Sequence, residues 1–319
     1  MLHLRSAYLF CVSLLLVVIV ASGTGAVSLA LAKTLVVGPD QEIKTLGDAA
    51  RAAGDGDTIE IEPVKGGWFD CANWRASHLT IEGKGDGVII TDRTCDGKGL
   101  FITTGNEITI RNLTFQRARV PDRNGAGIRA QGANLRVEHS RFVNNENGIL
   151  SGPAPDGKIF ILDSEFIGNG KCDTDCAHAI YIGKVALLHV EHCVFKDTHQ
   201  GHNIKSRALR TELIGNDIED GQTGTSSYLV DIPDGGSLIM KNNTLEKGPN
   251  SDNHSTAVVI GEEGVKQPTD EITISNNKFT NDIGTQTRFV RNFTATPATL
   301  TGNTLTGKIT ALDGDGAVQ

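Results

Sequence analysis

The hydrophobic residues of this chain recur in short alternating groups, not in long amphipathic runs. Pairs of apolar residues separated by a single residue open six units, at Leu79 and Ile81, Ile108 and Ile110, Leu135 and Val137, Ile159 and Ile161, Leu238 and Met240, and Ile272 and Ile274. Successive side chains of a β-strand point to opposite faces, so this alternation predicts short strands with one buried face. The periodicity of a helix is absent from these units.

A second motif, a small polar residue, a spacer and a large apolar residue, recurs between these strands. It begins at Ser140, Ser164, Cys193, Asn216, Asn243, Asn277 and Asn303, at intervals of 24, 29, 23, 27, 34 and 26 residues. Seven copies at this irregular period predict a solenoid of stacked β-coils with insertions of different length. Stacked Asn side chains can bond to one another and to the backbone at a turn, which gives their recurrence a physical reason.

Each unit also has another strand, and the later copies carry the chemistry. When Ile180, Ile204, Val230 and Val259 are aligned as core residues, the residues that follow them are Tyr181, Lys205, Asp231 and Ile260. These residues would point outward and form a ladder on one face of the stacked coils. Two positions further on, the same face carries Gly183, Arg207, Pro233 and Glu262.

The N-terminal part of the predicted domain contains a short helix. Thr45 to Asp48 match a capping pattern, and alanines at 49, 50, 52 and 53 favour a helix that ends before Gly54. Such a helix would cap the open edge of the first strand layer.

Residues 1–32 have the pattern of a secretory signal. Arg5 precedes an apolar run at about residues 7–21, and Ala30-Leu31-Ala32 is a small-x-small cleavage pattern. An uncleaved anchor is the alternative, but the run is short for a full membrane span. We therefore expect export to the periplasm or the extracellular space, no stable span after cleavage, and one domain at residues 33–319.

Composition and charge limit the classes of fold and of partner that fit this chain. Aromatic residues make up 5% of the chain and glycines number 37, which suits short strands and tight turns. The net charge of −8 argues against a nucleic-acid partner, which would require a basic face. Lys205 and Arg207 form a local basic cluster in this acidic chain, which indicates a specific site and not a general basic face.

Five cysteines follow the signal, at positions 71, 95, 172, 176 and 193. The first two are one repeat apart, and a bridge between them would join neighbouring coils. Cys172 and Cys176 could close a small loop and leave Cys193 as a buried thiol. Zinc requires four ligands and only His178 is near this pair, so disulfides are favoured.

The irregular coils, the recurring Asn and the capping helix resemble the right-handed parallel β-helix proteins of the pectate-lyase-like superfamily. The resemblance covers about residues 34–312, and residues 124–129, 201–208 and 227–236 resemble a bacterial exported subgroup. It implies an all-β right-handed parallel β-helix with a short N-terminal capping helix. In this superfamily, lyases and hydrolases work in a groove on the outer face of one sheet, where the ladder would lie.

Lyases of this architecture remove the proton next to a uronate carboxylate, after calcium or basic side chains have neutralised that carboxylate. Lys205 or Tyr181 would be the base and Arg207 the carboxylate clamp. Asp231 completes the catalytic set, with substrate binding expected from His178, His202, Tyr228, Glu262 and Glu263. No cofactor is required by this scheme, although calcium at the acidic residues is an alternative.

Several alternatives stay open. Lys205 with Asp231, and Arg207 with Glu262, could be purely structural ion pairs between coils. By strand parity, His178 and His202 share the inward face with Ile180 and Ile204, but they are near the strand start, where a turn can redirect them. They are either core or turn histidines satisfied by neighbouring backbone, or they stack on adjacent coils and line one end of the groove. An acidic polysaccharide is the expected partner, for a lyase, for a hydrolase using Asp231 and Glu262, or for a non-catalytic carbohydrate-binding or envelope scaffold protein. The oligomeric state is open.

Overall fold

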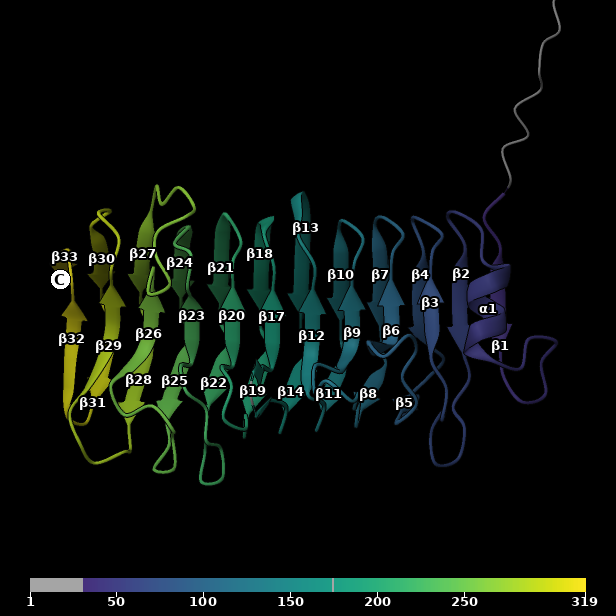
Figure 1. The fold of residues 1–319 in the computed structure, drawn as a ribbon, viewed down its shortest axis with the longest axis horizontal. Helices are drawn as coiled ribbons and strands as arrows, with labels where there is room; N and C mark the ends of the chain where they lie inside the picture. The colour runs from purple at the N-terminus through teal and green to yellow at the C-terminus, as the bar shows by residue number, and fades with distance from the viewer. Residues whose placement is uncertain (1–30, 174) are drawn as a thin grey trace, which may run out of the picture. The chain divides into compact units, whose positions relative to one another are not determined.

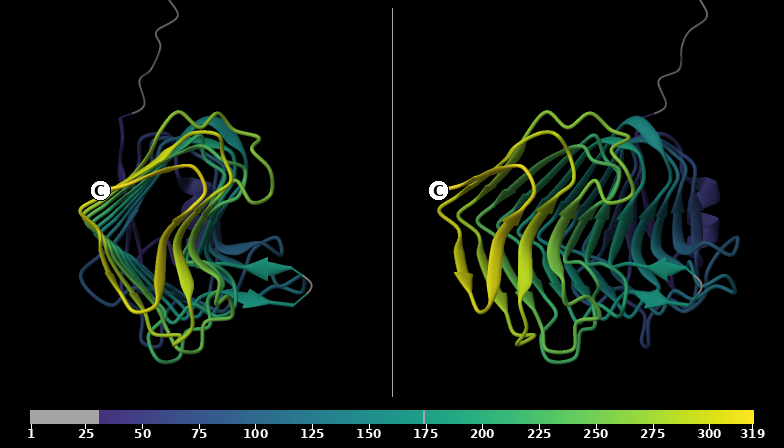
Figure 2. Two further views of the ribbon diagram at one scale, coloured as in Figure 1. Left: turned by 90° about the vertical axis from the view of Figure 1, so that its left-hand side faces the viewer. Right: turned by 60° about the vertical axis from the view of Figure 1, so that its left-hand side comes forward.

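The computed structural model describes residues 31–173 and 175–319, so the predicted signal, but for its last two residues, lies outside the described residues. Residues 32–319 form one unit, a coil in which three parallel sheets enclose the core (Figures 1 and 2). No helix in the described part is both long and apolar enough to cross a membrane.

Sheet A contains the alternating apolar pairs of the six predicted units. Its twelve strands are, in spatial order, β1 (Thr34–Val37), β2 (Thr58–Ile61), β4 (Thr80–Gly83), β7 (Ile108–Arg111), β10 (Leu135–Glu138), β13 (Ala154–Leu162), β18 (Val185–Glu191), β21 (Arg210–Ile214), β24 (Ser237–Lys241), β27 (Ile272–Ser275), β30 (Ala298–Thr301) and β33 (Gly316–Val318). Neighbouring strands pair in parallel, and residues such as Ile81, Ile110 and Val137 are buried in register.

Sheet B follows the recurring polar motif. Its strands are β5 (Ile89–Thr91), β8 (Thr114–Gln116), β11 (Arg141–Val143), β14 (Glu165–Ile167), β19 (Val194–Lys196), β22 (Asp217–Glu219), β25 (Thr244–Lys247), β28 (Lys278–Asn281) and β31 (Thr304–Thr306). The apolar residue of the motif points inward from this sheet. Phe115, Phe142, Phe166 and Phe195 stack with ring centres 5.2, 4.7 and 4.7 Å apart.

Sheet C completes each coil. Its strands are β3 (Ala72–Trp74), β6 (Gly99–Thr103), β9 (Ala126–Ala130), β12 (Asn147–Ser151), β17 (Ile180–Ile182), β20 (Ile204–Ser206), β23 (Val230–Ile232), β26 (Thr256–Ile260), β29 (Thr287–Asn292) and β32 (Ile309–Asp313). The outer face of this sheet carries the predicted ladder of polar residues.

The asparagines of the motif stack at the turn between sheets A and B, as predicted. Asn216 donates its side-chain amide to Asn243 over 3.0 Å, Asn243 to Asn277 over 2.8 Å, and Asn277 to Asn303 over 2.9 Å. Each amide also donates to a main-chain carbonyl. Because these amides satisfy one another inside the coil, the stack of asparagines fixes the register of successive coils.

The predicted capping helix and both predicted disulfides are confirmed. Helix α1 (Leu46–Ala52) begins after the N-cap Thr45, which accepts from the main-chain N–H of Asp48, and packs on the first coils. One disulfide joins Cys71 to Cys95 and the other Cys172 to Cys176, and Cys193 is a buried free thiol. The second disulfide closes an antiparallel hairpin, β15 (Lys171–Cys172) and β16 (Cys176–Ala177), which projects from the coil (Figure 2).

Candidate functional site

Three of the predicted site residues lie on successive strands of sheet C. Tyr181 on β17 pairs with Lys205 on β20, and Lys205 pairs with Asp231 on β23. Their neighbours Ile180, Ile204 and Val230 are fully buried. The three polar side chains are therefore adjacent on the outer face, as the alternation of the strands predicts.

The prediction of Ile260 as the fourth member of the ladder is wrong by one residue. Val230 pairs with Val258, so the residue beside Asp231 is Val259 and not Ile260. All of β26 is buried, Val259 included. The apolar run of this strand therefore lacks the polar positions that mark the outward face in the earlier copies.

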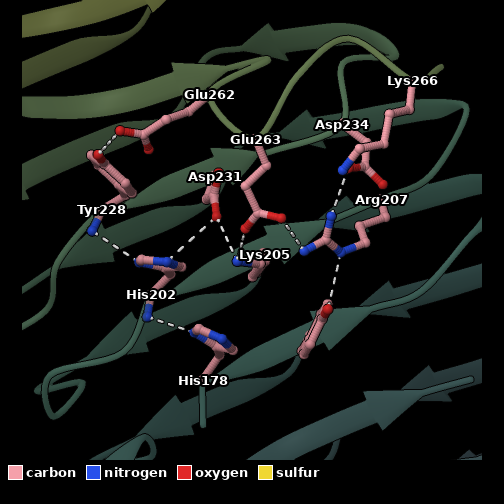
Figure 3. A network of polar contacts seen from close by, with 11 residues as sticks. His178, His202, Lys205, Arg207, Tyr228, Asp231, Asp234, Glu262, Glu263 and Lys266 are labelled. Carbon is pink, nitrogen blue, oxygen red and sulfur yellow. Dashed lines mark hydrogen bonds and ion pairs between the residues drawn. The ribbon is translucent and has the colours of Figure 1, made fainter. Parts of the chain in front are cut away.

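Glu263 joins the two cations of the site. Its carboxylate accepts from Lys205 Nζ over 2.9 Å and from Arg207 NH2 over 2.6 Å (Figure 3). The Glu263 side chain is 42% exposed, whereas those of Lys205 and Arg207 are 12% and 17% exposed. Burial acts to raise the pKa of Glu263, but the two cations outweigh it and hold the pKa below its ordinary value. The pair thus binds one exposed carboxylate.

Arg207 also organises two further groups. Its Nε donates to the phenol oxygen of Tyr181 over 2.9 Å, and its NH1 donates to Asp234 over 2.7 Å. The buried Asp234 accepts a second bond of 2.9 Å from Lys266. Burial acts to raise the pKa of Asp234, but these two cations keep the pKa below its ordinary value. Asp234 therefore fixes the orientation of the guanidinium as a permanent counter-ion.

The predicted ion pair between Arg207 and Glu262 is not formed. Glu262 instead accepts a bond of 2.8 Å from the hydroxyl of Tyr228, and burial together with Glu262 raises the pKa of this phenol. The chain turns at Gly261, which has a φ of 82°, directly after β26. Strand parity does not extend through this turn, and it is Glu263 that faces Arg207.

Asp231, like Asp234, is almost fully buried. The residue is 2% exposed, and its Oδ2 lies 3.2 Å from Lys205 Nζ, which confirms the predicted ion pair. Its Oδ1 is buried and has no partner among the described residues. Burial raises the pKa of Asp231 to about 6 in spite of Lys205. Conversely, burial acts to lower the pKa of Lys205, but Asp231 and Glu263 outweigh it and raise that pKa, so Lys205 stays an ammonium.

We expect the substitution Asp231→Asn to change how stability depends on pH. In the folded protein the pKa is raised from 3.8 to about 6, so the contribution of Asp231 to stability is complete below the unfolded pKa and is lost as pH rises through the folded pKa. Relative to wild type, the variant should gain on the order of 3 kcal/mol between about pH 4 and pH 7. Denaturant unfolding of both proteins across this range measures the difference, and a difference that does not vary with pH would contradict the assignment.

The two predicted site histidines are stacked outside the core. Their rings are 4.7 Å apart, and they line a pocket with Tyr181 and Lys205, so the alternative of stacked histidines at the groove is confirmed and the inward orientation from strand parity is wrong. The reason is that His178 and His202 precede the first residues of β17 and β20, where strand alternation does not yet apply.

The predicted backbone contacts of these histidines are confirmed. His178 Nδ1 accepts from the main-chain N–H of His202 over 2.9 Å, and His202 Nδ1 accepts from that of Tyr228 over 3.1 Å. Burial lowers the pKa of His178 and lowers that of His202 to about 3. Both rings are therefore neutral with the proton on Nε2, and His202 Nε2 lies 3.4 Å from Asp231.

A pocket of about 530 Å³ opens beside these residues. One side is the coil wall, and the other is formed by the loop at residues 122–124 and the end of the disulfide-closed hairpin. An ion pair between Arg123 and Asp173 joins this loop to the hairpin. The pocket is lined by Asp122, Arg123, Asn124, Asp175, Cys176, Ala177, His178, Tyr181, His202 and Lys205.

Comparison with known families identifies the coil. The family model described as "Right handed beta helix region" matches residues 57–218, just over half of the 319 residues. The chain belongs to this β-helix family. The pectate-lyase-like, right-handed architecture implied by the sequence is thereby confirmed.

Solved structures resemble this β-helix at low sequence identity. The crystal structure of pectate lyase Pel9A matches with a TM-score of 0.56 and 11% identity, covering 90% of this chain and 80% of that one. An alginate lyase from Paenibacillus sp. str. FPU-7 matches with a TM-score of 0.47 and 14% identity, covering 89% and 99%. No curated protein matches the sequence.

The outer face of the β-helix also holds residues that the sequence interpretation missed. Lys266 comes from the long connection between β26 and β27, and the 122–124 loop comes from the connection before β9. Neither segment follows the repeat, so no periodic signal marks them. Within residues 31–173 and 175–319, no group of three or more His, Cys, Asp or Glu side chains is placed to hold a metal ion such as calcium.

Proposed function

We propose that this protein is an exported polysaccharide lyase that binds an acidic glycan on the outer face of sheet C and cleaves it by β-elimination. The observation that carries the proposal is the bridge from Glu263 to Lys205 and Arg207, at 2.9 and 2.6 Å. These cations already bind one carboxylate of the protein, and a uronate carboxylate has the same charge and shape. The fold of a pectate lyase supports the same class of reaction.

The reaction places specific demands on the site. A base removes the proton from the carbon next to the carboxylate, and the bond between the adjacent carbon and the glycosidic oxygen breaks. A carbon–carbon double bond forms between these two carbons, and the leaving oxygen takes up a proton from water. Negative charge develops on a group that is already anionic, so cations must be held against it beforehand. Lys205 and Arg207 supply this charge without a metal, and Asp234 keeps Arg207 in place.

We assign the base to Tyr181. The raised pKa of Lys205 keeps its amine protonated, so Lys205 is suited to binding the carboxylate and not to accepting a proton. The Tyr181 oxygen accepts from Arg207 Nε, which holds it on the groove side next to the carboxylate-binding pair. Tyr228, Glu262 and the two histidines lie along the same face and would contact neighbouring sugars.

A hydrolase is the second candidate, because of Asp231. A buried carboxyl whose pKa is raised to about 6 has the property required of a general acid in glycoside hydrolysis. Glu262 would be the second acid in this scheme.

The test is an assay of the full-length protein on a panel of uronate-containing polysaccharides. Rising ultraviolet absorbance from unsaturated uronate ends supports the lyase. New reducing ends without that absorbance support the hydrolase. Binding without either product supports a non-catalytic carbohydrate-binding protein and refutes both enzymes.

We expect the substitution Glu263→Gln to strengthen uronate binding. The neutral amide competes less well than a carboxylate for Lys205 and Arg207, so a ligand carboxylate displaces it more easily. The Kd should fall about tenfold, which corresponds to the free energy of one strong hydrogen bond. Isothermal calorimetry with galacturonate and guluronate oligomers measures it.

Glu165→Gln is the matched control for this substitution. It makes the same change in net charge, but Glu165 pairs with Arg141 on sheet B, away from the site. Equal gains in the two variants would mean that net charge is responsible. Weaker binding by Glu263→Gln would mean that Glu263 contacts the ligand and does not compete with it.

A further inference from the structure

Arg129 lies on the same outward ladder as the site, three coils before Lys205. Arg129 on β9 pairs with Leu150 on β12, Leu150 pairs with Tyr181 on β17, and Tyr181 pairs with Lys205 on β20. These four strands are consecutive in sheet C (Figure 1). Because neighbouring strands are about 4.8 Å apart, the backbone at Arg129 lies about 14 Å from that at Lys205 along the coil.

The guanidinium of Arg129 differs from Lys205, Arg207 and Lys266 in forming no ion pair with any described residue. Lys205, Arg207 and Lys266 each bind a carboxylate within 3.2 Å. Arg129 forms no ion pair among the described residues, and its buried Nε has no hydrogen-bond partner there. Leaving a buried polar atom of an arginine without a partner is costly, so this atom calls for a partner from outside the described chain, such as water or a ligand.

The pocket beside the site and Arg129 have one neighbour in common, Asp122. Asp122 lines this pocket together with Tyr181 and Lys205, and it is also the charge that acts on Arg129. A ligand that fills the pocket from Lys205 to Asp122 would come next to Arg129.

We propose that Arg129 is a second carboxylate subsite, and that the ligand is a chain of successive uronates running along the coil. A glycan with a single acidic sugar would satisfy one of the two positions, whereas a polyuronate presents carboxylates at both. The inference rests on the proposed function for the first position, at Lys205 and Arg207. It goes beyond that function by assigning a carboxylate contact to Arg129, three coils away from Lys205.

The experiment compares short and long ligands on the full-length protein. Isothermal calorimetry is run with the dimers and hexamers of galacturonate and of guluronate, in the Tyr181→Phe background to prevent cleavage. The additional substitution Arg129→Gln is expected to weaken hexamer binding about tenfold to a hundredfold, as expected for a hydrogen bond to a charged group. Dimer binding should stay within about twofold, and Arg129→Lys should restore part of the hexamer affinity.

Arg141→Gln is the matched control, since Arg141 lies on sheet B with Glu165 as its partner, and it should change neither affinity. Unchanged hexamer binding in Arg129→Gln overturns the subsite alone. Equal losses for dimer and hexamer also overturn it, because they place the effect of Arg129 on the first position. Failure of both oligomer lengths to bind before Arg129 is changed overturns the proposed function and the subsite together.

Discussion

Replacing Arg207 with glutamine is expected to lower kcat/KM for the release of unsaturated ends by about two to three orders of magnitude. Arg207 makes three contacts that no other side chain supplies together: to Tyr181 at 2.9 Å, to Asp234 at 2.7 Å and to Glu263 at 2.6 Å. Its loss removes half of the carboxylate-binding pair and releases the proposed base. Initial rates on the best polyuronate substrate, with calorimetric binding in parallel, measure both effects.

The same substitution costs stability, and the control separates the two effects. Asp234 is buried, and removing one of its two cations is expected to cost up to about 3 kcal/mol. Lys266→Gln removes the other cation but does not contact Tyr181 or Glu263. It should therefore reduce stability while leaving the rate within a few-fold of wild type.

Arg207→Lys keeps the charge but loses the planar fork, so it should recover binding only in part. Full activity in Arg207→Gln would eliminate the proposed site.

The coil could be predicted from the sequence because its signals repeat. From Ser140 onward, the turns between sheets A and B place a small polar residue or Cys193 at the same register, and each coil adds an apolar residue such as Phe142 or Phe166 to one stack. A slip of one residue would bury the polar face of the strand, so the pattern of alternation specifies both the strands and their stacking. The same argument placed Tyr181, Lys205 and Asp231 side by side.

The contacts of the site could not be predicted in the same way, because they depend on turns. Glu263 reaches Lys205 from a turn two coils away, and no period in the sequence relates the two residues. His178 and His202 precede their strands, where parity does not apply. By contrast, Arg129 does follow the period: it comes directly after Ile128, which pairs with Ile149 and so with Ile180. Extending the alignment backward by two coils would have identified it.

The second large effect is expected from Tyr181→Phe, which removes a single oxygen. If Tyr181 is the base, product formation should fall by about two to four orders of magnitude, the usual contribution of a general base. The bond lost is the one from Arg207 Nε, and Arg207 keeps Asp234 and Glu263, so ligand binding should persist. The expected signature is therefore a large loss in kcat with KM changed only a few-fold.

Tyr228→Phe provides the matched comparison for Tyr181→Phe. It also removes one phenol oxygen from the same face, but that hydroxyl donates to Glu262 and lies away from the Lys205 and Arg207 pair. A lyase with Tyr181 as its base should lose far less activity at Tyr228. If instead Tyr181→Phe retains activity while Asp231→Asn abolishes it and reducing ends accumulate without absorbance, the proton is transferred by the acid with the raised pKa. The same face of sheet C would then belong to a hydrolase.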